Sequence, residues 1–212
     1  MRICTAADPL NVEANDLMGV TQMLLGDYSG SLASLSRTPE IAADPNMGPD
    51  LLIAQYFNGV ITRADFERHV ETEFAPVILG TYLYALVDHP DPRQRDPEFV
   101  LRLLTSQNAL LSDFRWPGTV EIVARIRLED WAGALEVFDT RFKPQFLMLV
   151  TPMSYEFMRA LIYAHLGRPD EARQAHRRGM LAWDDWTRDQ PSAWEHSDAM
   201  RWRRAAEAVL AR

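Results

Sequence analysis

The sequence is poor in several residues on which whole protein classes depend. Cys4 is the only cysteine, so an internal disulfide and a multi-cysteine metal site are excluded, and its place near the chain end indicates an inert thiol. No apolar run approaches the roughly 18 residues of a membrane-spanning helix. Residues 1–5 lack the apolar segment of a secretory signal. These absences predict a soluble, cytoplasmic protein.

Positive charge is also scarce. Acidic residues number 30 against 22 basic ones, the formal net charge is −8, and the pI is near 5.1. This balance argues against nucleic acid or an anionic membrane as a partner. A chain of 212 residues, 47% hydrophobic and 25% charged, suits one large globular domain.

The chain has none of the common catalytic signatures. It contains no GxxxxGK[ST] or GxGxxG phosphate loop and no GxSxG. Its only lysine, Lys143, precedes a proline that excludes a mid-sheet position, and the kinase loops HRD and DFG are missing. The five histidines show neither HxxxH nor HExxH spacing, and Asp184 and Asp185 would point about 100° apart on a helix. The sequence therefore predicts a non-enzyme without metal or cofactor.

Three segments of the chain have the same shape: an apolar run, a break, and a second apolar run. They can be aligned on Gly26, Glu129 and Gly167. Five residues later all three have a small residue, and seven residues earlier two of the three do; these positions are Ser31, Ala134 and Ala172, and Gly19, Ile122 and Ala160. Two antiparallel helices joined by a tight turn approach closely only where both carry small side chains. A glycine in the turn supplies the positive φ that ends a helix.

The spacing of these turns predicts the architecture. Gly26 and Glu129 are 103 residues apart, about three periods of 34 residues. Two further turns are expected between them, and they are found at Gly59, with Ala64 five residues later, and in the proline-rich loop His89–Pro97. The only strand-like run is Phe146–Val150. We therefore expect an all-α, right-handed superhelix of about five antiparallel helix pairs forming a single domain over residues 1–212. The expected pairs span roughly 12–39, 49–73, 76–108, 117–142 and 153–180, with a capping helix at 197–211.

These residues resemble a known family. Leu24–Leu32 and Leu166–Ala172 look like the turn and second helix of tetratricopeptide repeats. From Thr81 onward the chain is similar to the C-terminal repeat region of planctomycete-type serine/threonine kinases, through the stretches Tyr82–Leu86, Pro90–Pro97, Glu129–Asp139, Ala164–Gly179 and Arg201–Leu210. The resemblance covers roughly residues 9–212 and implies a bacterial protein with a repeat fold. It says little about function, because such repeats mainly hold partners.

The chain departs from that family pattern in two ways. Gln22, Gly118 and Glu121 stand where the repeats usually carry large apolar residues, so atypical packing is expected there. Ala7–Asn11 looks like the end of a helix pair whose first members are missing. This predicts either an uncapped first repeat or a chain cut from a longer protein.

The predicted function is that of a non-enzymatic scaffold. First helices at roughly 13–25 and 153–165 would line a concave groove that binds a peptide or a partner helix. The residues expected to contact this partner are Asp16, Val20, Met23, Phe157, Leu161 and His165. The set lacks the Lys/Asn clamp with which chaperone-tail-binding repeats hold a terminal carboxylate. For His176 a semi-buried packing role is favoured, and for the tryptophans clustered after residue 182 a hydrophobic lid over the last repeat, with an aromatic docking surface as the alternative.

Two other function classes stay open at this stage. The chain could be the regulatory or substrate-recruiting repeat segment of a truncated or split serine/threonine kinase, with the kinase module encoded upstream. An α-helical hydrolase with an unrecognised site is the third class, and a deep polar pocket with clustered carboxylates would favour it.

Overall fold

The computed structural model describes residues 9–44, 47–73, 76–89, 91–106, 117–141, 151–186 and 193–211. All regular structure in these ranges is helical, with twelve α-helices and one 3-10 helix, and no strand occurs in them. The all-α prediction is confirmed for this part of the chain. Cys4, Lys143 and the strand-like run Phe146–Val150 lie outside it.

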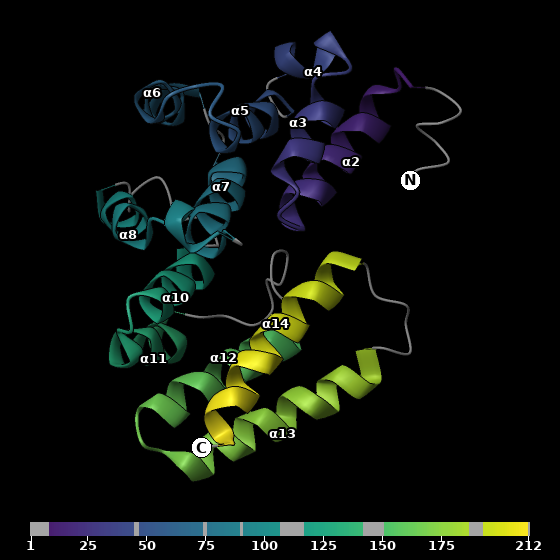
Figure 1. Cartoon of the computed structure of the whole chain (residues 1–212). Coiled ribbons are helices and arrows are strands. Elements are labelled where there is room, and N and C mark those ends of the chain that lie inside the picture. Colours follow the sequence, from purple (N-terminus) through teal and green to yellow (C-terminus); the bar gives the residue numbers. More distant parts are fainter. Residues whose placement is uncertain are drawn as a thin grey trace. The chain divides into compact units, whose positions relative to one another are not determined.

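The chain divides into two compact units, Met1–Gln94 and Arg95–Arg212. The first unit contains these described helices (Figure 1): α2 (Val12–Leu24), α3 (Tyr28–Leu35), α4 (Pro39–Ala43), α5 (Gly48–Phe57), α6 (Arg63–Glu73), α7 (Pro76–Asp88) and the 3-10 helix η1 (Pro92–Gln94). Helices α2 and α3 pack as a pair, and α5 contacts every other α-helix of the unit. A buried cluster ties α3, α4 and α5 together through Leu35, Ile41, Leu51 and Ala54.

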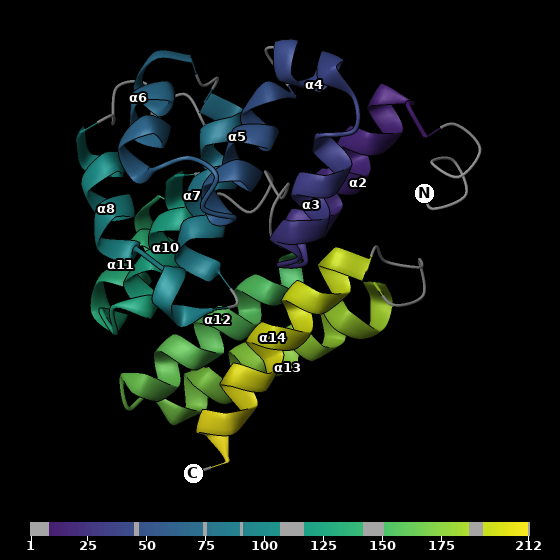
Figure 2. The ribbon, with the colours of Figure 1, turned by 45° about the horizontal axis from the view of Figure 1, so that its top comes forward.

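The second unit contains α8 (Pro97–Ser106), α10 (Pro117–Arg127), α11 (Trp131–Thr140), α12 (Pro152–His165), α13 (Pro169–Trp186) and α14 (Ala193–Leu210). Its main packed pairs are α10 with α11 and α12 with α13, and α8 packs on α10. The C-terminal helix α14 lies against α12, and Figures 1 and 2 both show α12, α13 and α14 grouped together. The helices of the predicted pair 76–108, α7 and α8, belong to different units. The final helix begins at Ala193, ahead of the predicted 197.

The turns between paired helices share one backbone conformation. Gly26, Gly59, Glu129 and Gly167 have φ angles of 81°, 69°, 59° and 69°. At each of them the residue's own N–H bonds to the carbonyl three residues back. The next N–H bonds five residues back, as from Asp27 to Gln22 (2.8 Å) and from Asp130 to Arg125 (2.9 Å). This paired bonding is the Schellman motif that ends a helix. The three positions aligned in the sequence (Gly26, Glu129 and Gly167) and the fourth at Gly59 therefore form the same helix-terminating motif.

The residue after two of these turns starts the next helix. Asp27 accepts a hydrogen bond from the Gly30 backbone N–H (2.9 Å), and Asp130 accepts one from Gly133 (3.0 Å). An aspartate at this position satisfies a backbone donor that the helix itself cannot pair. A left-handed residue followed by a capping aspartate thus ends one helix and begins its partner within two residues.

Small residues occupy three of the four helix-pair seams. Ser31, Ala134 and Ala172 are fully buried, as are Ile122 and Ala160 on the facing helices. A Cβ on Gly19 would lie 2.4 Å from the Leu35 Cγ, so α2 and α3 approach too closely for a larger residue there. The prediction is wrong at Ala64, which is exposed. The pair α5–α6 therefore does not reproduce the close seam of the other three.

Candidate functional site

The residues predicted to contact a partner in the first unit lie on α2, but they differ in exposure. Asp16 and Val20 are partly exposed, whereas Met23 is buried. The prediction is therefore corrected for Met23, because its side chain belongs to the core and offers no surface to a partner. Asp16 and Val20 stay available on one side of the helix.

Asp16 belongs to an acidic cluster that sequence reasoning missed. The negative charge of Asp44 and partial burial both raise its pKa, burial contributing more. Asp50, at the start of α5, is more deeply buried, and burial together with the charge of Asp16 raises its pKa to about 7. Three carboxyl groups from α2, the end of α4 and α5 thus share one region. These three positions come together through tertiary packing. Their spacing in the sequence follows no helical or strand period that would predict it.

In the second unit the predicted contact residues Phe157 and Leu161 are buried. Phe157 packs against α13: a Cβ added to Gly179 would lie 2.7 Å from its ring, and the His176 ring is 5.6 Å away. The prediction that these two side chains line an open groove is therefore wrong for this structure. It failed because it treated the inner face of α12 as free, and this face is covered by helices of the same unit.

His165 is the exposed member of the predicted set on α12. Its ring stacks on Trp131 at the start of α11, with centroids 3.9 Å apart and planes at 4°. Trp131 is partly exposed, so the pair presents a flat aromatic surface to solvent where the two helix pairs meet. Aromatic rings of this kind are frequent anchors of protein interfaces. The nearby Arg168 guanidinium lies over the Tyr163 ring, 4.6 Å from its centroid.

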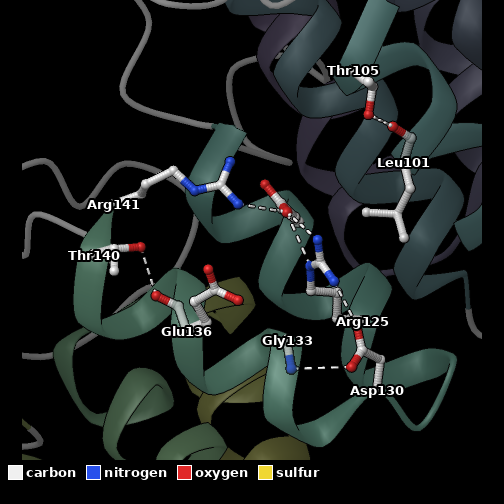
Figure 3. A network of polar contacts seen from close by, with 9 residues as sticks. Leu101, Thr105, Arg125, Asp130, Gly133, Glu136, Thr140 and Arg141 are labelled. Atoms are coloured by element: carbon white, nitrogen blue, oxygen red, sulfur yellow. Dashed lines mark hydrogen bonds and ion pairs between the residues drawn. The ribbon is translucent and has the colours of Figure 1, made fainter.

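Glu121, flagged in the sequence as out of place, is the centre of a charged network between α10 and α11 (Figure 3). Its carboxylate is only 8% exposed and accepts bonds from Arg125 Nε (2.9 Å) and Arg141 Nη2 (2.7 Å). Arg125 also donates to Asp130, the cap of α11, as Figure 3 shows. Because a buried carboxylate is costly unless it is paired, these two arginines explain how Glu121 is tolerated at a buried position. The network joins the two helices, with Glu121 buried at its centre and Arg141 and Asp130 at its exposed edge.

A second polar network joins α12 to α14. Ser154 Oγ donates to Asp198 Oδ2 (2.7 Å), Thr151 Oγ1 lies 2.8 Å from Ser154 Oγ, and Arg201 Nη2 bonds Asp198 Oδ1 (2.6 Å). Beside it, Thr119 and Tyr155 share a hydrogen bond of 2.7 Å, and burial raises the pKa of the Tyr155 hydroxyl. Ser154 and Asp198 are buried, so this serine has no access to a substrate.

The C-terminal tryptophans divide into two environments. Trp183 is buried, and its ring is 5.1 Å from His196 and 5.8 Å from the Arg203 guanidinium, both on α14. Trp202 is 1% exposed, and its ring is 5.1 Å from the Arg127 guanidinium and 5.6 Å from the Arg201 guanidinium. Both rings make contacts between α14 and other helices of its unit.

The comparisons with known proteins add no further constraint. No family model, curated protein or solved structure matches this chain. Within the described ranges, no three His, Cys, Asp or Glu side chains are placed to hold a metal ion. None of the described helices has the length and apolar character needed to cross a membrane.

Proposed function

We propose that this chain is a tetratricopeptide-like repeat protein that binds a peptide or helix of a protein partner. The observation that carries the proposal is the repeated turn. Left-handed residues at 26, 59, 129 and 167 are separated by 33, 70 and 38 residues, close to one, two and one periods of 34. Three of these turns also have a buried small residue five positions later: Ser31, Ala134 and Ala172. A stack of such helix pairs has no chemistry of its own but offers long helical faces to other proteins.

The exposed members of the predicted contact set define the surfaces that we assign to partner binding. In the second unit this surface is the stacked pair His165 and Trp131. In the first unit it is Asp16 and Val20, with Asp44 and Asp50 nearby. The carboxylates of Asp16 and Asp44 favour a partner segment that carries basic residues, since opposite charges steer association and select the partner.

Site-specific photo-crosslinking tests this function. A photoreactive amino acid is placed in the whole chain at Val20 or at His165, and at exposed Gln174 on α13 as a matched control. After irradiation in extracts of the source cells, mass spectrometry identifies the adducts. We expect proteins captured from Val20 and His165 that are absent from Gln174, with the Val20 adduct weakened by added salt. The same adducts from all three positions, or none from either test position, would contradict the proposal.

A further inference from the structure

The outer side of α2 is an exposed stripe that combines apolar and acidic side chains. Glu13 and Leu17 are four residues apart, so they lie on one face of the helix, and Leu10 comes just before it. Leu10 is 68% exposed and Leu17 is 53% exposed. Glu13 is also exposed and has no basic partner among the described residues. Because α2 carries no basic residue, this stripe is apolar and negatively charged.

The outer side of α13 is an exposed stripe of the opposite charge. Arg173, Arg177 and Leu181 follow one another at intervals of four residues, and all three are exposed, Leu181 to 68%. Arg173 bonds Asp170 (2.6 Å), whereas Arg177 has no acidic partner in the described part of the chain. Helix α14 contacts α13 on another side, at Trp183. The stripe on α13 is therefore uncovered, apolar at one end and positively charged along the rest.

Inside the chain, the second helix of one pair packs antiparallel against the first helix of the next pair. This holds for α3 with α5 and for α11 with α12. Tyr28 at the start of α3 contacts Phe57 at the end of α5 (ring centroids 4.3 Å apart), as Trp131 at the start of α11 contacts His165 at the end of α12. The opposite ends of the same helices also meet, at Leu35 and Leu51 and at Phe138 and Tyr155. Helix α13 is a second helix and α2 a first helix, so within the described ranges each lacks a neighbour of this kind.

We propose that copies of this chain associate head to tail, with the exposed stripe of α13 in one copy packed antiparallel against the exposed stripe of α2 in the next. Placing Arg177 opposite Glu13 brings Leu181 opposite Leu10, and the aliphatic stem of Arg173 opposite Leu17. Opposite charges select this register, and the leucines remove apolar surface from water. The contact joins different faces, so it produces chains or rings of copies. It involves few residues, so association is weak and depends on protein concentration.

This inference goes beyond the proposed function, and its test needs only the purified full chain. Sedimentation velocity over a concentration series at low ionic strength measures association. The average mass should rise above that of one 24.2 kDa chain as the concentration increases, and added salt should lower it. Glu13→Arg and Arg177→Glu each bring like charges together, so each should weaken association about fivefold or more.

Mixing these two charge variants distinguishes a contact between copies from a loss of folding. In the mixture, the unchanged α2 of the Arg177→Glu chain meets the unchanged α13 of the Glu13→Arg chain. The two altered stripes are again opposite in charge. The mixture should therefore associate to within about twofold of wild type, although each variant alone is impaired. A contact within one chain would not respond to mixing.

The apolar part of the contact has its own variant and a matched control. Leu181→Ser should weaken association about fivefold or more. Val60→Ser changes a residue of similar exposure (60%) between α5 and α6 and should associate as wild type does. A monomer at every concentration would overturn the inference, as would association that the charge variants leave unchanged or that mixing does not restore. Failure of the crosslinking experiment in extracts would reject the proposed function and leave this result standing.

Discussion

Glu129 is the described non-glycine residue with a positive φ, and its turn is otherwise the same as those at the glycines. A side chain in the left-handed region costs about 1 kcal/mol because its Cβ crowds the backbone. Gly167 has no heavy atom within 4 Å of an added Cβ, so a substitution there changes only the backbone preference. Glu129 and Gly167 therefore form a matched pair for measuring the free-energy cost of a side chain at positive φ.

We predict opposite effects of exchanging residues at these turns. Gly167→Ala should lower the free energy of unfolding by about 1 kcal/mol. Glu129→Gly should raise it by a smaller amount, because the glycine also increases the entropy of the unfolded chain. Urea denaturation followed by circular dichroism measures both. Effects of the same sign would show that the turns at Glu129 and Gly167 are not equivalent.

Asp50 gives a prediction about pH. Its pKa is raised to about 7 in the folded protein, from an unfolded value near 3.8, so the folded state keeps a proton that the unfolded state loses between these values. Stability contributed by this group therefore falls as the pH rises from about 4 to 7, with a slope of at most about 1.4 kcal/mol per pH unit. Asp50→Asn should remove this slope and be more stable than wild type at pH 8. Denaturation at pH 5 and 8 tests this, with exposed Asp170→Asn as the control; identical pH dependence in Asp50→Asn and wild type would refute it.

At the scale of helices, the sequence located the elements well because their ends depend on local chemistry. A left-handed glycine followed by a capping aspartate marks the end of α2 and the start of α3 whatever lies around them. The exposed faces were harder to predict, since exposure depends on neighbours distant in the chain. Phe157 is buried because α13 packs against it, whereas Ala64 on α6 is exposed. The acidic cluster around Asp16 was not predicted either, because its members come from helices that only the tertiary fold brings together.

The seam of α12 and α13 provides a prediction at this scale. Ala172 is fully buried where the two helices approach, so Ala172→Trp should overpack the seam and cost about 1 to 3 kcal/mol or more. Gln174→Trp, two residues further on an exposed face, should change stability by no more than about 0.5 kcal/mol. Thermal unfolding of both variants makes the comparison. Similar losses at the two sites would show that the repeat alignment places the seam wrongly.

At the scale of the whole chain, the N-terminal and C-terminal helix pairs differ in how much neighbouring structure covers them. Helix α12 contacts α11, α13 and α14. The outer side of α2 carries exposed apolar side chains, with Leu17 53% exposed and Leu10, just before the helix, 68% exposed. If the helix pairs form the array that we propose, stability is a sum of repeat and nearest-neighbour terms. The pair α2–α3 therefore has fewer stabilising contacts than the pair α12–α13.

We predict that this difference appears as a gradient of hydrogen exchange along the chain. Segments with few buried contacts open at lower free energy, so amides of residues 13–37 should exchange faster than those of 155–180 in the absence of a partner. The Leu17 side chain is already more than half exposed, so Leu17→Glu should reduce the protection of residues 13–37 only slightly. The protection of residues 155–180 should be unchanged. Leu35→Ala, in the buried cluster of the first unit, should accelerate exchange over 13–37 strongly because it opens a cavity beneath α2 and α3. Uniform protection of both helix pairs in the monomeric protein would show that α2 is as well supported as α12, and would remove the basis for treating the two ends of the chain as different.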